Sequence, residues 1–175
     1  MSYRAYRKMR IMSNPATRKG GFRPRILLVS AALVLGAMSG VCAAGMPQIV
    51  HARQNHFKTL GRTFKSLRDQ IGRSRPNWNL VADDANRIER LAAALPSWFP
   101  AGSGQGSGVR TRASATIWSQ PQVFARAARK LLTRAQDLRQ AAAGRDLGAL
   151  RLRTRALGQA CGSCHRRFRA HGSWW

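Results

Sequence analysis

The spacing of apolar residues constrains the fold of this chain more than any other feature. Four stretches repeat an apolar residue every three or four positions, and the first runs through Phe57, Leu60, Phe64, Leu67 and Ile71. Similar stripes occupy residues 80–95, a segment that starts near residue 114 and reaches 138, and residues 146–171. This period places the apolar side chains on one face of an α-helix. No stretch alternates convincingly as a β-strand does, so the sequence predicts an all-α fold.

The segments between the stripes are rich in glycine, proline and serine, which end helices and form loops. They include GRSRPNW, FPAGSGQGSGV and AAAGRD, and Gly144 in the last of them is the expected end of a helix. Connections of this length favour antiparallel neighbours. We therefore predict one antiparallel four-helix bundle within residues 45–175.

The first 44 residues have a different character. Eight basic residues and no acidic residue precede the apolar segment ILLVSAALVLGAMSGVCAAG, which ends in small residues. This order is typical of a signal peptide, with Ala43 or Ala44 as the last residue removed. The alternative is a membrane anchor, but Ser, Gly and Cys shorten the apolar run below the roughly 20 residues that a span needs. Residues 1–44 are thus predicted to be a basic leader and cleavable signal peptide.

The charge of the chain is strongly positive. Its 175 residues include 31 Lys and Arg against 6 Asp and Glu, which gives a formal charge of +25. From residue 45 onward there are 23 basic and 6 acidic residues, a charge of +17. Such a surface favours an acidic redox protein or an anionic membrane surface as partner. Nucleic acid is not expected, because no strand combines basic residues with aromatic residues that could stack on bases.

The last stripe ends in QACGSCHRRFR, which places Cys161, Cys164 and His165 within five residues. On a helix these residues share a face. Two thiols at this spacing can form thioethers to the vinyl groups of one haem, and the adjacent histidine can then bind the iron. The motif therefore predicts one covalently attached haem c per chain.

Three other interpretations of the motif are weaker. A CxxC redox pair would be expected to open a helix beside β-strands. A zinc site needs four ligands, and the other histidines beyond residue 45 are His51, His56 and His171. A plain disulfide would leave His165 without a role.

The sixth iron position is usually taken by methionine or histidine. The candidates are Met46, at the start of the exported chain, and His56 in the first helix. If Phe57 faces the haem together with Arg53 and Gln54, His56 points about 100° away from Phe57. The iron is then expected to be five-coordinate, with an apolar distal wall.

Several motifs together resemble those of cytochrome c prime, the class II c-type cytochrome family. They are CGSCHRRFR at the C-terminus, RQNHFKTLG in the first helix, FPAGSGQGSG before the third helix and TRASATIW at its start. The resemblance extends over nearly the whole region that follows the leader. It implies a periplasmic homodimer of four-helix bundles whose iron is usually five-coordinate and binds NO, and often CO.

The resemblance also assigns residues by position. It implies thioethers at Cys161 and Cys164 and an iron ligand at His165. It further implies a set of haem contacts in which Phe57 limits access to the iron: Arg53, Gln54, Phe57, Thr111, Arg112 and Arg169. The leading hypothesis is a gas-binding haem protein, and the alternative is an electron carrier with acidic partners. An enzyme is not expected, because no distal acid–base pair is placed over the iron.

Overall fold

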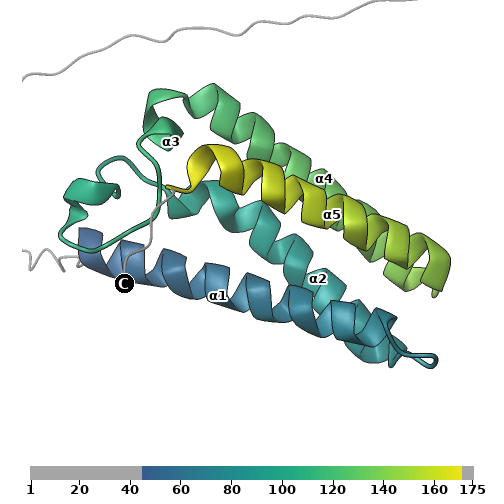
Figure 1. The fold of residues 1–175 in the computed structure, drawn as a ribbon. Coiled ribbons are helices and arrows are strands. Elements are labelled where there is room, and N and C mark those ends of the chain that lie inside the picture. Colours follow the sequence, from purple (N-terminus) through teal and green to yellow (C-terminus); the bar gives the residue numbers. More distant parts are fainter. Residues whose placement is uncertain (1–44, 171–175) are drawn as a thin grey trace, which may run out of the picture. The chain divides into compact units, whose positions relative to one another are not determined.

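The structure is a computed structural model that describes residues 45–170. Its long helices are α1 (Met46–Ile71), α2 (Trp78–Ala94), α4 (Pro121–Ala143) and α5 (Leu147–Phe168). Three short elements complete it, namely the 3₁₀ turns η1 (Leu95–Trp98) and η2 (Gln105–Ser107) and the helix α3 (Thr116–Ser119). The long helices pack as an antiparallel bundle (Figure 1), which confirms the predicted all-α fold. The expected signal peptide and His171 lie outside the described residues.

Local sequence signals start the helices where the structure places them. The side chain of Asn77 accepts hydrogen bonds of 3.1 Å from the backbone N–H groups of Asn79 and Leu80 at the start of α2. Asp146 accepts a 3.0 Å bond from the N–H of Ala149 at the start of α5. These side chains satisfy N–H groups that have no partner within the helix, as an N-cap does.

The third apolar stripe forms two helices, α3 and α4, instead of the single helix predicted from residue 114. The break falls at Gln120, whose φ of −130° and ψ of 58° are not helical. Gln120 precedes Pro121, and the proline ring disfavours the helical conformation of the residue before it. Pro121 itself is tolerated because the first helical position needs no hydrogen-bonded N–H.

The end of α4 agrees with the predicted helix end at Gly144. The N–H of Gly144 donates to the carbonyl of Gln140 at 3.1 Å, and the N–H of Arg145 donates to that of Ala142 at 3.2 Å. The next residue, Arg145, takes a left-handed φ of 52°. Arg145 thus has a backbone conformation that is unfavourable for arginine and that glycine adopts at little cost.

Helix α5 ends at Phe168, three residues before the predicted end, because the loop that precedes α3 pairs with the chain that follows. Arg169 is extended and forms an isolated β-bridge with Ala113. The N–H of Ser114 donates to the carbonyl of Phe168 at 2.9 Å, and the N–H of Ala170 donates to that of Arg112 at 2.8 Å. The loop of residues 99–115 is thereby fixed to the end of α5.

The buried core draws on all four long helices. Its most deeply buried large side chains are Leu67, Val81, Ile88, Leu138, Leu150 and Leu157. Each belongs to one of the predicted apolar stripes, whereas Val50 of α1 is equally buried and lies outside them. In the described part of the chain no helix is both long and apolar enough to span a bilayer.

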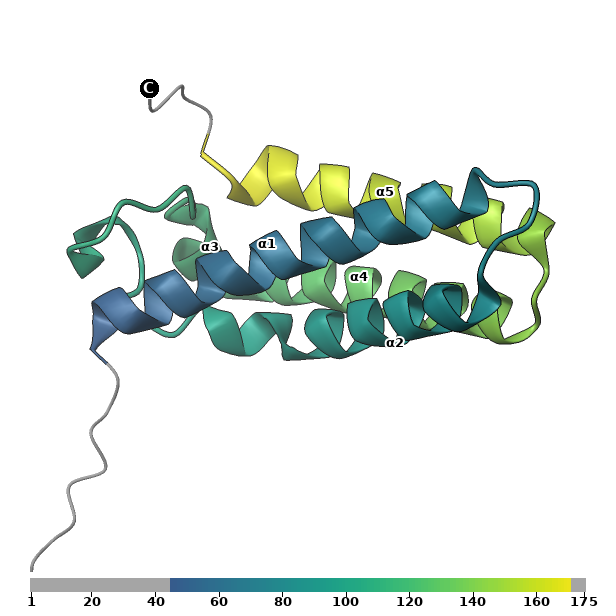
Figure 2. The same cartoon turned by 90° about the horizontal axis from the view of Figure 1, so that it is seen from below.

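The two ends of the bundle differ. At one end, here called the cleft end, α1 begins, α5 finishes and the loop of residues 99–115 is found (Figure 2). At the other, the far end, α1 and α4 finish and α2 and α5 begin (Figure 1). The functional residues predicted from the sequence gather toward the cleft end.

Candidate haem site

A cleft of about 920 Å³ is enclosed by α1, the loop of residues 99–115, α4 and the last turns of α5. This volume lies within the range of roughly 300–1,000 Å³ that is typical of ligand and cofactor pockets. Eight of the nine predicted site residues line the cleft: Arg53, Gln54, Phe57, Thr111, Arg112, Cys164, His165 and Arg169. Cys161 is the exception; like Cys164 it is half-buried and packs against the hydrophobic core, but it does not line the cleft.

The wall formed by α5 carries Cys164 and His165. Both cysteines of the motif are free thiols, so no disulfide joins them. Burial and the neighbouring Cys161 raise the pKa of Cys164 to about 11. Burial likewise raises the pKa of Cys161. Both sulfur atoms therefore carry their protons at neutral pH.

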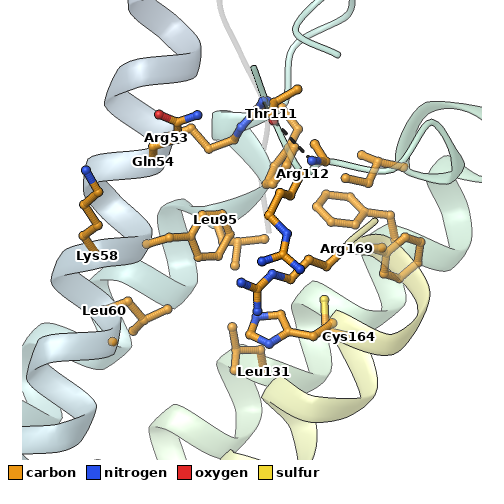
Figure 3. A pocket seen from close by; sticks show the side chains of 18 of the residues that line it. Arg53, Gln54, Lys58, Leu60, Leu95, Thr111, Arg112, Leu131, Cys164 and Arg169 are labelled. Carbon is orange, nitrogen blue, oxygen red and sulfur yellow. Dashed lines mark hydrogen bonds between the residues drawn. The ribbon is translucent and has the colours of Figure 1, made fainter. Parts of the chain in front are cut away.

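His165 is held in its neutral form. The residue as a whole is exposed, yet partial burial lowers its pKa, and the positive charges of Arg169 and Arg112 lower it further. A neutral imidazole is the form that binds a metal ion. Figure 3 shows Arg112 and Arg169 converging on the middle of the cleft, one from the loop and one from the end of α5. The β-bridge beside them fixes both backbones.

The wall formed by α1 combines apolar side chains, among them Phe57, Leu60 and Phe64, with the polar side chains of Arg53, Gln54 and Lys58. The ring of Phe57 is half-buried and makes edge contacts with Trp98 at 5.2 Å and with Phe99 at 6.1 Å between ring centroids. Phe99 continues the cluster to Phe124, and Phe124 to Phe168. Edge-to-face contacts of this kind stabilise aromatic clusters. Phe57 is thus supported from behind by a connected set of rings.

Arg53 fixes the loop at the mouth of the cleft. Its guanidinium donates to the hydroxyl and to the carbonyl of Ser103, each at 2.9 Å. It also donates to the hydroxyl of Thr111 at 2.9 Å (Figure 3). It also lies 4.7 Å from the ring centroid of Phe99. The side chain is buried, and this burial lowers its pKa. Next to it, Gln54 donates to the carbonyl of Arg110 at 2.8 Å.

Neither candidate for the sixth iron ligand lines the cleft. His56 stacks on Trp98 with ring centroids 4.8 Å apart and does not take part in the lining. Met46 is exposed near the start of α1. Within residues 45–170, no group of three His, Cys, Asp or Glu side chains is placed to hold a metal ion, so the zinc interpretation gains no support.

Several lining residues were not predicted as part of a site. Leu131 and Leu95 belong to apolar stripes and were expected only in the core, while Lys58 had no distinguishing signal. Ser103, which does not itself line the cleft, is completely buried within the loop of residues 99–115 and bonded to Arg53. Its Gly/Ser-rich surroundings predict an exposed loop, so the sequence contains no sign of its burial.

The residues present fit a haem. The cleft has apolar walls for a flat macrocycle, arginines for its acidic groups, and a thiol and a neutral imidazole on one wall. Bound there, a haem supplies an iron that takes its axial ligand from the protein and can bind small gases.

Comparisons with known proteins point to one family. Residues 48–169 match the family model described as Cytochrome C'. The chain is 29% identical over 147 residues to cytochrome c' of Rhodospirillum rubrum, which covers 83% of this chain and 98% of that protein. The fold is similar to that of a cytochrome c' with a ligand-controlled dimer dissociation, with a TM-score of 0.69 at 22% identity over 73% of this chain and 98% of the other.

A third similar protein is cytochrome c prime from Alcaligenes xylosoxidans, in the nitric oxide complex of a point mutant. Its TM-score is 0.67 at 21% identity, and the match covers 74% of this chain and 98% of that one. At these identities the structural matches show a shared fold.

Proposed function

The chain belongs to the cytochrome c' family of haem proteins, and we propose from that premise that its haem iron is five-coordinate and binds NO, and also CO, on the side that faces Phe57. The family consists of periplasmic, non-enzymatic haem proteins. In the proposal Cys161 and Cys164 carry the thioethers, and His165 is the axial ligand. Each thioether would join a cysteine sulfur to a haem vinyl group by net addition of S–H across the C=C bond, with no leaving group.

The observation that carries the proposal is the composition of the cleft wall. Among the residues that line it, Cys164 and His165 are the ones with a sulfur or an imidazole. The wall of α1 offers Phe57, which cannot coordinate iron. The space next to this ring suits a neutral diatomic molecule, which needs no hydrogen-bond donor to enter an apolar site.

The remaining residues of the site have supporting roles. Arg53 and Gln54 hold the loop, and with it Thr111 and Arg112, at the mouth of the cleft. Arg112 and Arg169 face the acidic groups of the haem. Their charges also keep His165 neutral and therefore able to bind iron.

The visible spectrum of the ferrous protein tests the proposal, recorded before and after addition of NO and of CO. A high-spin spectrum that shifts with both gases is the expected result. A low-spin spectrum that neither gas changes would contradict it, because a protein side chain would then occupy the sixth position. Replacing His56 by Gln and Met46 by Leu would identify that side chain.

Two further parts of the proposal follow from the family. The chain is exported to the periplasm after cleavage beyond Ala43 or Ala44, and it forms a homodimer. The mass of the protein purified from periplasm tests the first statement, and its sedimentation velocity tests the second. An uncleaved mass, or a monomer at micromolar concentration, would contradict the respective statement.

A second candidate function is electron transfer to an acidic redox protein, and the distribution of charge favours it. The cleft is lined by Arg53, Lys58, Arg110, Arg112 and Arg169 and by no acidic residue. Five of the six acidic residues of the described chain lie toward the far end, namely Asp69, Asp83, Asp84, Asp137 and Asp146, while Glu89 lies past the middle of α2. A molecule charged in this way would turn its haem cleft toward an acidic partner.

A further inference from the structure

A second cavity, of about 370 Å³, lies between α1 and α5 toward the far end of the bundle. Its lining comes from the last two turns of α1 with Gly72, and from the middle of α5. The ring of Phe64 lines both this cavity and the haem cleft. The haem cleft lies at the other end of the interface between the same two helices.

The interior of the cavity is apolar. Phe64 and Ile71 provide its hydrophobic surface from α1. The hydroxyl of Thr154 is already used, because it donates to the carbonyl of Leu150 at 2.8 Å. Opposite Phe64 stands Gly158, and a Cβ atom there would lie 3.6 Å from the tip of the phenyl ring. The missing side chain of Gly158 therefore leaves space against an aromatic ring.

The rim of the cavity is positive. Arg68 comes from α1, and Arg151 and Arg155 come from successive turns of α5, while no acidic residue takes part in the lining. Arg151 is held in place by bonds of 3.3 and 3.2 Å to the carbonyl of Ile71. Within the described chain, neither Arg68 nor Arg155 has an ion pair or a side-chain hydrogen bond.

Three arginines around one opening have an energetic cost. Like charges at positions i and i+4 of a helix, such as Arg151 and Arg155, destabilise it. A bound anion would remove this repulsion, and guanidinium groups bind carboxylates through paired hydrogen bonds. A negatively charged group at the opening would therefore be stabilised by the arginines, and the interior of the cavity behind the opening is apolar.

We propose that this cavity binds a small amphipathic carboxylate. The carboxylate lies between Arg68 and Arg155, and the hydrocarbon chain lies against Phe64 and Ile71. The site is separate from the haem cleft and does not depend on the function proposed for it.

Calorimetric titration of the haem-loaded protein with octanoate tests this proposal. Haem in the larger cleft prevents the probe from binding there. Acetate carries the charge without the chain, and octan-1-ol carries the chain without the charge. Octanoate is expected to bind at least tenfold more tightly than octan-1-ol, since a hydrogen bond to a charged group is worth about 1.5–3 kcal/mol, and at least tenfold more tightly than acetate, since each buried CH2 group is worth about 0.8 kcal/mol. Equal affinity for octanoate and acetate, or for octanoate and octan-1-ol, would overturn the proposal.

Matched variants locate the binding site. R155Q is expected to weaken octanoate binding about tenfold, a loss equivalent to about 1.4 kcal/mol. R153Q is the control, because Arg153 lies on the same helix but faces Asp137, at 3.9 Å. It should leave octanoate binding unchanged. If R155Q and R153Q bind octanoate equally well, the cavity is not the site.

A third variant changes the space without changing the charge. G158A adds a methyl group at ordinary contact distance from Phe64, so the helix should remain folded. We expect octanoate affinity to fall severalfold while acetate binding stays the same. Unchanged octanoate affinity in G158A would show that the chain does not enter the cavity.

Discussion

At the scale of single residues, Phe57 determines access to the iron in the proposed site. In Phe57→Ala the CO association rate should rise about tenfold, which corresponds to removing about 1.4 kcal/mol of barrier. Flash photolysis of the CO complex measures this rate. Phe64→Ala is the control, since Phe64 is another half-buried phenylalanine of α1 that lines the cleft. Identical CO kinetics in the wild type and Phe57→Ala would exclude a gating role for Phe57.

The protonation of His165 predicts a pH dependence of folding. Its pKa in the folded chain lies below the unfolded value of about 6.5. The unfolded chain therefore binds more protons, and the stability of the haem-free protein should fall as the pH drops below about 6.5. Urea unfolding between pH 7.5 and 5 measures this effect. His165→Gln should lose that part of the slope, and equal slopes in both proteins would contradict the assignment.

At the scale of elements, the loop of residues 99–115 depends on the guanidinium group of Arg53. Lysine cannot reproduce its forked hydrogen bonds, so Arg53→Lys should cost about 2 kcal/mol and accelerate amide exchange in the loop. Arg62→Lys is the matched control, because Arg62 is exposed on the same helix and should change stability by less than about 0.5 kcal/mol. Equal loop exchange in the two variants would show that Arg53 does not hold the loop.

One residue in the connection between α4 and α5 has a strained backbone conformation that a substitution can relieve. Arg145 has a φ of 52°, which glycine adopts without steric cost. Arg145→Gly should raise the free energy of unfolding by about 0.5–1 kcal/mol, as measured in urea. Gly144→Ala serves for comparison, because Gly144 has an ordinary helical φ of −74° and a Cβ there has room. A less stable Arg145→Gly variant would mean that the arginine makes a compensating contact.

The elements were predictable to different degrees for physical reasons. Helices α1, α2 and α5 follow from apolar residues repeated at the helical period, a signal that each segment carries within itself. The division of α3 from α4 could have been predicted from Pro121. The loop of residues 99–115 has no such local signal, because its conformation is set by Arg53 and by the end of α5. Thr111 and Arg112 were consequently placed by resemblance alone.

At the scale of the whole molecule, the lining of the haem cleft, which is basic and has no acidic residue, predicts that the cleft end meets an acidic partner. Lys58→Glu changes the charge at the cleft, and Arg73→Glu makes the same change in the loop that follows α1. The rate of electron transfer with an acidic protein such as flavodoxin should fall about threefold to tenfold in Lys58→Glu at low ionic strength.

The same rate should change little in Arg73→Glu, and the difference between the two variants should vanish at high salt. Stopped-flow mixing at several salt concentrations provides the measurement. Equal rates in both variants would show that the cleft end does not direct the encounter, and would leave gas binding as the better-supported function.

The contacts that close the cleft join residues far apart in the chain. Arg53 reaches Ser103 and Thr111 across 50 and 58 positions, whereas α4 and α5 are neighbours joined by residues 144–146. Bringing distant segments together costs more chain entropy than closing a short turn, so the α4–α5 hairpin should form early and the cleft late. The part of the protein that binds the cofactor is then also the part that opens most readily. Bound haem would therefore stabilise the region of the native state that unfolds most readily. Loss of haem would increase local unfolding at the cleft before it affects the rest of the bundle.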